Sequence, residues 1–548
     1  MQKPLAGLNR RNLLRELTAG VTLLAIAIPL NIGYAQIAGL PATAGLYALI
    51  VPTVIYALVV SSRQLVASPD AAAAALVASS IGGLAAAGSA DYATLAMAQA
   101  IICGILFVAL AVLKLGFLAN FLSKPILVGF VGGLALDILV SQIAKMLGVK
   151  TDSGGEFVDK MIGLVTGLGT TNLVSLVISI ISVAILLGGR RLMPAVPWAL
   201  VVLVLGTVAV VIADLDDAGV DVLGEVPAGL PAITWPVIDW TMWLALIPSA
   251  IALTLVTTAE GLLVSRSYGE KRGYQTSPNR DLFAIGLGNV AAGASASFAV
   301  GASTSRTAAM DQAGSRTQLP SLVLAAGTVL LLLFGTALLA DIPSPAIGAI
   351  VGVAILPLLG IREFTTLWRQ DRFEFVVGAA CFLVTLFIGA IPGIVVAFVL
   401  ALINLAKRAA NPAIDVLAST GEPTDSLLEE APTGAVTAPG VVVVRLAAPL
   451  FFANSTVFSD AVKRAVRGAD AAGRGPVRHV VIDMEAVTDV DVTGAESFEV
   501  LLTWLALHDV DLGFSRVRPE ARTRLSDLGL LGDRPVYETN RAAIADLG

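Results

Sequence analysis

Apolar segments of membrane-spanning length repeat along most of the chain, from Thr18 to Ala406. Each is about 20 residues long, which is enough for an α-helix to cross the ~30 Å hydrocarbon core of a bilayer. The pattern therefore predicts an α-helical polytopic membrane protein. About fourteen segments are expected, at residues 18–38, 42–60, 69–87, 93–113, 125–147, 172–189, 197–213, 246–266, 281–297, 305–315, 319–340, 344–360, 373–389 and 391–407.

The composition agrees with this pattern and narrows the function classes. Of the 548 residues, 56% are hydrophobic and 14% are charged, and the mean hydropathy is +0.85. These values exclude a water-soluble globule for the part of the chain that holds the apolar segments. The net charge of −6 argues against nucleic-acid binding. Cys103 and Cys381 lie far apart within apolar segments, so neither a disulfide framework nor a cysteine-based metal site has support.

Basic residues fall on alternating loops between the predicted segments, as the positive-inside rule requires of cytoplasmic loops. This distribution predicts a multi-pass protein of the inner (plasma) membrane, in contact with lipid, with both termini cytoplasmic and residues 1–17 forming the cytoplasmic N-terminus. No small-residue cleavage site follows the first segment, so we expect no signal peptide. The predicted cytoplasmic set is Arg10, Arg11, Arg15, Arg63, Lys114, Arg190, Arg191, Arg266, Lys271, Arg272, Arg316, Arg362, Arg369, Arg372, Lys407 and Arg408.

Two predicted segments are too short or too broken to be simple spans. They are the third, introduced by Ser68-Pro69-Asp70, and the tenth, introduced by the small-residue stretch Gly301–Ser305. These two segments hold equivalent places in two consecutive sets of seven segments. Because seven is odd, the two sets cross the membrane in opposite orientations. We therefore predict a 7+7 inverted repeat whose third and tenth segments are half-helices with their N-termini facing one another near the bilayer midplane.

An anion site is the chemistry that this arrangement favours. Two helix N-termini would direct backbone N–H groups and positive dipole ends at one point, where Arg306 adds a guanidinium. Arg306 could instead satisfy carbonyls or snorkel at a cytoplasmic helix end, the hydroxyls and Asp70 could be helix caps, and Asn31 and Tyr34 could serve packing. The predicted substrate-binding residues are Arg306, Ser305, Thr304, Ser303, Ser68, Pro69, Asp70, Asn31 and Tyr34.

Two carboxylates within apolar segments are candidates for cation coupling. Glu260 lies in the eighth segment and Asp137 in the fifth, each without a neighbouring base in sequence. An intramembrane carboxylate is a functional candidate by default, because it can carry a proton or coordinate a small cation. The alternative is a structural ion pair for Glu260 and exposure to a water-filled crevice for Asp137. No cofactor is expected beyond co-transported H⁺ or Na⁺.

The composition changes after Arg408, where the transmembrane domain (18–408) gives way to a polar linker (409–438) and a soluble α/β domain (439–548). In that domain Thr493 follows Asp489-Val-Asp491 at a strand-to-helix turn, where it is either a regulatory phosphorylation site or a helix cap. No nucleophile–base pair, metal cluster or cofactor loop appears there, so an enzyme is not expected. The predicted elements are strands 441–448, 480–484 and 512–517, helices 454–468, 495–508 and 520–530, and a last short strand and helix.

These residues carry a resemblance to a known family. The chain resembles the SulP anion transporters, bacterial relatives of the animal sulfate and bicarbonate solute carriers, and its last part resembles a STAS domain. The motifs are Ala42–Leu49 continuing through Tyr56 to Arg63, the run from Arg63 to Ala71, Ser305-Arg306-Thr307-Ala308 with Gly314 and Thr317-Gln318, Phe451–Asn454, and Val490–Gly494.

The resemblance implies a core domain, carrying the two half-helices, that moves against a gate domain in alternating access. It also implies a homodimer and an acidic coupling residue at Glu260. In the sodium-dependent bicarbonate branch a hydroxyl residue follows four positions later. Here that position is Val264, which favours protons, whereas Thr304 keeps one hydroxyl expected near a sodium site.

The sequence thus predicts a secondary active transporter of a small anion, sulfate or bicarbonate first, driven by proton or sodium symport. An uncoupled uniporter or channel, an exchanger and a dicarboxylate transporter remain open, since hydroxyls, backbone amides and one guanidinium suit all these anions. A nucleobase transporter would share the seven-plus-seven architecture but would need no Arg306. The STAS-like domain is expected to act as a regulatory module with a cytoplasmic protein partner.

Overall fold

The computed structural model describes residues 5–10, 12–117, 124–150, 156–193, 196–417 and 435–548. Arg11 and residues 418–434 of the predicted linker therefore lie outside the described residues. The chain divides into two compact units, residues 1–401 and 402–548, and each is described by itself.

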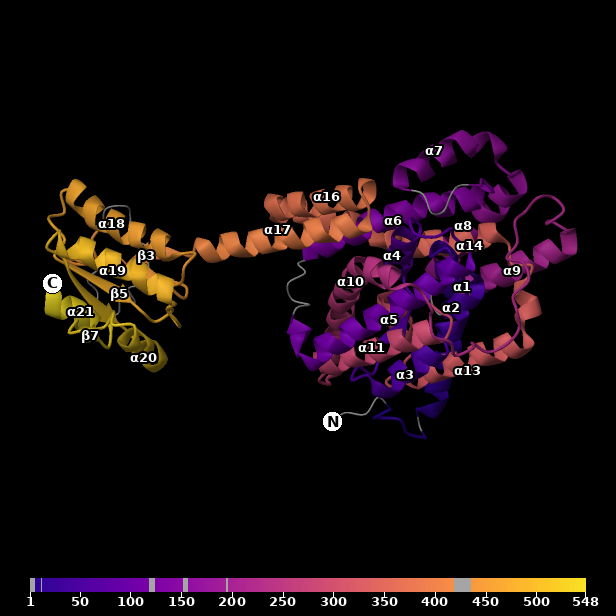
Figure 1. The fold of residues 1–548 in the computed structure, drawn as a ribbon, viewed down its shortest axis with the longest axis horizontal. Coiled ribbons are helices and arrows are strands. Elements are labelled where there is room, and N and C mark those ends of the chain that lie inside the picture. The colour runs from indigo at the N-terminus through magenta and orange to yellow at the C-terminus, as the bar shows by residue number, and fades with distance from the viewer. Residues whose placement is uncertain (1–4, 11, 118–123, 151–155, 194–195, 418–434) are drawn as a thin grey trace. The chain divides into compact units, whose positions relative to one another are not determined.

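The first unit is helical, and its elements follow the apolar pattern (Figure 1). Each of the fourteen predicted segments coincides with a helix or with two consecutive helices. The helices are α1 (Leu13–Ile37), α2 (Ala42–Tyr47), α3 (Val51–Val59), α4 (Ala71–Ile81), α5 (Ala90–Val112), α6 (Lys124–Leu147), α7 (Phe157–Gly167), α8 (Leu173–Leu192), α9 (Trp198–Ala213), α10 (Trp240–Arg272), α11 (Pro278–Ala294), α12 (Thr304–Gln312), α13 (Leu319–Phe334), α14 (Ser344–Ile355), α15 (Ile361–Gln370), α16 (Arg372–Phe387) and α17 (Ala390–Ala410), which crosses into the second unit.

The predicted polytopic membrane architecture is confirmed, although the count of fourteen spans stays a prediction. Within the described residues, eight helical stretches are long and apolar enough to cross a membrane, and α4, α9 and α13 are shorter apolar helices. Two helices, α7 and α15, lie in loops where the sequence predicted no element. Their apolar residues are interrupted by charged ones, so neither has the uniform apolar run on which the prediction of spans rested.

Glycines set how closely the long helices pack. Helices α5 and α11 lie side by side (Figure 1), and a Cβ added at Gly104 would approach the Gly286 carbonyl oxygen to 2.7 Å. Between α6 and α16, a Cβ at Gly129 would come within 2.2 Å of the Gly378 carbonyl oxygen. Membrane helices associate through such small-residue contacts because lipid provides no hydrophobic driving force between them.

The second unit is an α/β fold with a five-stranded sheet in the order β3-β4-β5-β6-β7, in which β3 and β4 are antiparallel and the other pairs are parallel. Val442 and Val444 pack with α18 and α19, whereas Val441 and Val443 pack with α21 on the opposite face. Its elements are β3 (Ile414–Val416), β4 (Val441–Leu446), α18 (Ser455–Ala471), β5 (His479–Asp483), α19 (Val492–Ala506), β6 (Asp511–Ser515), α20 (Pro519–Asp527), β7 (Val536–Tyr537) and α21 (Asn540–Leu547).

The predicted α/β order agrees with these elements, with one difference at the predicted linker. Residues Ile414–Val416 lie within residues 409–438 but form β3, which pairs antiparallel with β4 through Ile414 opposite Leu446. A three-residue edge strand carries too little pattern to be recognised in sequence, because its apolar residues alternate over only one repeat.

Candidate functional site

Two short strands bring the third and tenth predicted segments together. Strand β1 (Val66–Ser68) pairs antiparallel with β2 (Gly301–Ser303), with Ser68 opposite Gly301. Helix α4 starts two residues after β1, following Pro69 and Asp70, and α12 starts directly after β2. The antiparallel pairing therefore places two helix N-termini side by side, which is the juxtaposition that the inverted repeat predicts.

The place where β1 pairs with β2 and the N-termini of α4 and α12 meet is called the crossing below. The residue types there explain its local geometry. Gly301 lies so close to Asp70 that an added Cβ would approach the Asp70 Oδ2 to 2.2 Å. Asp70 caps α4, because its Oδ1 accepts a hydrogen bond from the Ala73 N–H at 2.7 Å. Ser303 caps α12 by accepting from the Arg306 N–H at 3.3 Å. The capping that was an alternative for Asp70 and Ser303 is thus observed, in the same place as the candidate site.

Arg306 lies at the centre of the crossing and is 1% exposed, so it does not snorkel to a membrane surface. Its Nε donates to the Ser303 Oγ at 2.9 Å, and its Nη2 donates to the Pro69 carbonyl oxygen on the other half-helix. The guanidinium carbon stands 5.6 Å from the centre of the Tyr34 ring. Among the described residues no carboxylate lies within ion-pair distance of Arg306, and its Nη1 has no hydrogen-bond partner.

Two more predicted residues hold buried polar atoms without a partner in the described chain, namely the Ser68 Oγ and the Asn31 Oδ1. The Asn31 Nδ2 donates to the Ala27 carbonyl oxygen at 2.7 Å, so only half of that amide is satisfied. Thr304 and Ser305 are exposed on the first turn of α12. Unsatisfied buried donors and acceptors are costly, so their presence at one crossing points to a polar ligand or water that completes them.

Glu260 lies on α10, which packs against β2, α4 and α12. The neighbouring Gly261 allows this approach, since a Cβ there would meet the Ala302 Cβ at 3.0 Å. Glu260 interacts electrostatically with Asp70, and in the described residues it has no hydrogen bond or ion pair. The structural ion pair weighed as the alternative for Glu260 is therefore not observed.

Asp137, the second predicted coupling residue, is not brought to this crossing. It pairs with Lys160 of α7, whose Nζ lies 2.8 and 3.0 Å from the two carboxylate oxygens. The pair lines a cavity whose lining includes neither Arg306 nor Glu260. Lys160 could not be found as a partner from the sequence, because α7 was read there as loop.

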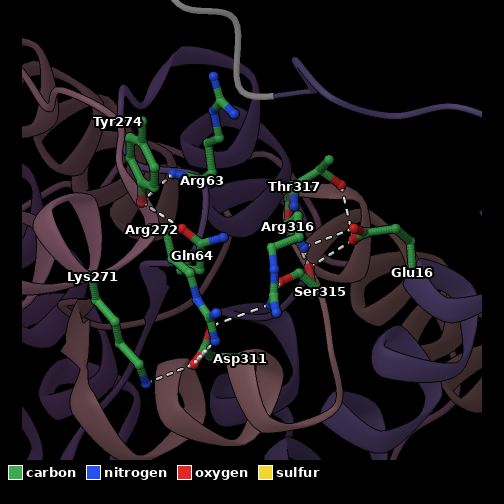
Figure 2. A network of polar contacts seen from close by, with 10 residues as sticks. All are labelled: Glu16, Arg63, Gln64, Lys271, Arg272, Tyr274, Asp311, Ser315, Arg316 and Thr317. Carbon is green, nitrogen blue, oxygen red and sulfur yellow. Dashed lines mark hydrogen bonds and ion pairs between the residues drawn. The ribbon is translucent and has the colours of Figure 1, made fainter. Parts of the chain in front are cut away.

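A network that the sequence did not predict holds α12 from its far end (Figure 2). Asp311, with its side chain 3% exposed, pairs with Lys271 and Arg272 of α10 at 3.0 and 2.7 Å and with Arg316 at 3.4 Å. Glu16 of α1 accepts from the Arg316 N–H at 2.7 Å. The network links α1, α10 and α12, so Arg306 is carried on a helix that is fixed at both ends.

Thr307 is a further site residue that the sequence missed. Its hydroxyl accepts a hydrogen bond from the Val66 N–H at 3.0 Å and donates to the Ser303 carbonyl oxygen at 2.6 Å. It therefore joins β1 to the first turn of α12 directly beside Arg306. The sequence placed Thr307 in the motif Ser305–Ala308 but gave no sign of its role in joining the two segments.

In the second unit, the helix cap proposed for Thr493 belongs to another residue. The Asp491 Oδ1 accepts from the Gly494 N–H at 2.6 Å, which makes Asp491 the N-cap of α19. Thr493 is exposed on the first turn, so the capping alternative for it is wrong. Phosphorylation of Thr493 stays a prediction.

Comparison with known proteins adds evidence independent of this geometry. Residues 13–381 match the sulfate permease family, and residues 434–543 match the STAS domain. A probable sulfate transporter of Mycobacterium tuberculosis is 34% identical over 539 residues, covering 98% of this chain and 95% of that protein. The structure of SLC26A9 matches with a TM-score of 0.88 at 21% identity, over 99% of this chain and 92% of that one, which shows a common fold. The transmembrane domain of the cyanobacterium bicarbonate transporter BicA matches with a TM-score of 0.63 at 25% identity, over 71% of this chain and 98% of that one.

Proposed function

The chain belongs to the sulfate permease family, and from this premise we propose that it is a secondary active transporter of a small oxyanion, with sulfate and bicarbonate as the leading substrates. The family and the relatives support anion transport by a multi-pass membrane protein, not an enzymatic activity. The relative named as a probable sulfate transporter favours sulfate as the substrate, whereas the match to the bicarbonate transporter BicA supports bicarbonate as a second candidate.

One observation carries the proposal: Arg306 is a buried guanidinium with an N–H that has no partner in the described residues, at the meeting point of two helix N-termini. Asp70 interacts electrostatically with Arg306 but caps α4 and forms no ion pair with it in the described residues, so the buried guanidinium still lacks a bonded counter-ion, which an anion would supply. The guanidinium is planar and suits the oxygens of an oxyanion. In this proposal the anion lies between α4 and α12 and takes the free Nη1 donor together with the helix N-termini.

Uptake of labelled sulfate into proteoliposomes tests this assignment. We expect Arg306→Ala to abolish saturable uptake, and Arg306→Lys to retain only a small part of it because an ammonium lacks the guanidinium fork. Arg266→Ala is the matched control, since Arg266 is 72% exposed and pairs only with the nearby Glu270. Wild-type uptake by a well-folded Arg306→Ala protein would refute the central site.

For the coupling ion we propose that Glu260 carries a proton, with sodium as the alternative. Glu260 is a carboxylate without a fixed partner in the described residues, next to the site that holds the anion. We expect Glu260→Gln to make uptake insensitive to imposed proton and sodium gradients while anion exchange persists, because an amide cannot exchange a proton. Glu270→Gln, at an exposed position of the same helix, is the control. Uptake that ignores both gradients in the wild type would instead favour a uniporter.

The remaining assignments follow from the family and are proposed with it. We infer a homodimer in the plasma membrane with both termini cytoplasmic, in which the core moves against the gate during transport. The STAS domain is proposed to bind a cytoplasmic protein partner, with Thr493 as a regulatory position. Deleting residues 439–548 and measuring flux separates regulation from transport itself.

A further inference from the structure

A second cavity lies close to the half-helices but is separate from the Arg306 crossing. It has a volume of about 190 Å³ and is enclosed by α1, α4, α6, α7 and the turn between α16 and α17. Ala75 lines it, only about 6 Å along the axis from the first residue of α4, Ala71. Gln36 lines it from α1, half a turn after Tyr34, which faces Arg306. The cavity is thus a neighbouring compartment on the same two helices.

One polar side chain of the cavity lining, Gln142, has no hydrogen-bond partner within the described protein. Gln142 of α6 is 1% exposed, and neither its Nε2 nor its Oε1 has a hydrogen-bond partner in the described residues. A buried amide with both ends unsatisfied is rare in folded proteins, and the usual reason is a bound ion or water. Gln142 lines this cavity, and because neither amide atom has exposed surface, a rotation of the side chain brings the amide to a ligand there.

The charges around the cavity indicate the sign of that partner. Lys160 is neutralised by Asp137 at 2.8 Å. Lys145 is half-buried, and its one hydrogen-bond partner in the described chain is the neutral Gln36 Oε1 at 3.0 Å. An ammonium has three donors, so two remain for another acceptor. Glu156, the other carboxylate of the lining, is exposed at the edge. The interior therefore keeps an uncompensated positive charge at Lys145.

We propose that this cavity is a second anion-binding site, an antechamber in which a small hydrated oxyanion is held by the Lys145 ammonium and the Gln142 amide N–H before or after it occupies the crossing at Arg306. A volume of about 190 Å³ accommodates one oxyanion with part of its hydration shell. The inference deepens the proposed transport function and rests on it.

A different role for Lys145 makes a different prediction. The Lys145–Gln36 hydrogen bond joins α6 to α1 and could serve only as a latch between them. A latch is broken equally by removing either partner, whereas in a binding site the loss of Lys145 weakens anion binding more than the loss of Gln36. Gln36→Leu and Lys145→Met therefore separate the two roles.

Sulfate uptake kinetics in proteoliposomes give the first test. Lys145→Met and Gln142→Leu should each raise KM about tenfold, the effect of one lost hydrogen bond to a charged or buried group, with kcat within about twofold. The exposed control Lys124→Met, on the same helix as Lys145, should keep the wild-type KM, and Gln36→Leu, which leaves the ammonium in place, should change KM less than Lys145→Met does. An unchanged KM in Lys145→Met, or a Gln36→Leu variant that reproduces its effect, would overturn the antechamber.

The second test needs no transport, so its failure is distinct from failure of the proposed function. Ser141 lines the cavity, and Ser141→Cys can be introduced with Cys103→Ala and Cys381→Ala, which remove both native thiols. We expect an anionic methanethiosulfonate reagent to label this cysteine faster than a cationic one, sulfate to slow the labelling, and Lys145→Met to lower the anion-to-cation rate ratio about tenfold. A ratio near one, or a ratio unchanged in Lys145→Met, would refute the site even if Arg306 behaves as proposed.

Discussion

Asp311→Asn removes the charge at the centre of the cluster that holds the end of α12, and its cost can be worked from the contacts. The Lys271 pair contributes under about 1 kcal/mol, because the lysine side chain is 57% exposed. The bidentate contact with Arg272, at 2.8 and 2.7 Å, is the stronger one, and hydrogen bonds to a charged group contribute about 1.5–3 kcal/mol. Asparagine keeps one acceptor oxygen, so part of this contact survives.

The expected loss is therefore about 2–3 kcal/mol of unfolding free energy. It falls below the 3–5 kcal/mol typical of a broken buried pair, because no buried charge is left behind and the three cations are 57%, 26% and 37% exposed. Equilibrium unfolding by SDS titration in mixed micelles measures it. The matched control is Glu270→Gln, whose pair with Arg266 is 68% and 72% exposed and should cost under about 0.5 kcal/mol. Equal unfolding midpoints for Asp311→Asn and Glu270→Gln would refute a stabilising role for the Asp311 network.

Two further substitutions test the packing of each unit. Gly301→Ala should abolish anion uptake while the protein still folds, because the new Cβ would lie 2.2 Å from the Asp70 Oδ2 at the crossing; Gly83→Ala, with nothing within 4 Å, should transport normally. Arg445→Met should lower the unfolding free energy of the second unit by about 1.5–3 kcal/mol, because the fully buried Asp483 loses its charged partner at 2.8 Å but keeps Arg516 at 3.7 Å and the Asn540 amide at 3.1 Å. Hydrogen exchange of residues 441–548 measures this loss, and the exposed Arg518→Met should show none.

The parts of the fold that the sequence predicts are those that depend on local pattern. A run of apolar residues sets a membrane helix, and the small residues before Arg306 and around Pro69 mark two broken segments. The meeting of those segments was predictable only because an odd repeat of seven fixes their orientation. Strand β3 was missed, since three residues carry no periodicity.

The contacts of the site join residues that are far apart in the chain, and a local sequence pattern does not predict such contacts. Asp311 is 39 residues from Arg272, so its pairing follows from the packing of α10 against α12 and not from sequence spacing. Asp137 and Glu260 look alike in sequence, as single carboxylates in apolar segments. Packing separates them, because α7 supplies Lys160 to Asp137 and no described basic residue pairs with Glu260.

The bonded partners of an ionisable group therefore indicate its role better than its burial does. Asp311 is deeply buried but bonded to three cations, so its charge is already balanced and its role is structural. Arg306 is as buried, but among the described residues it is bonded only to neutral oxygens and keeps one free donor. Glu260 interacts electrostatically with Asp70 of the same site and has no cation partner in the described residues. A charge that the fold leaves unbalanced favours a mobile counter-ion. In the symport proposed above, an anion at Arg306 and a cation at Glu260 would be these mobile partners, on either side of the fixed carboxylate of Asp70, which interacts electrostatically with both residues.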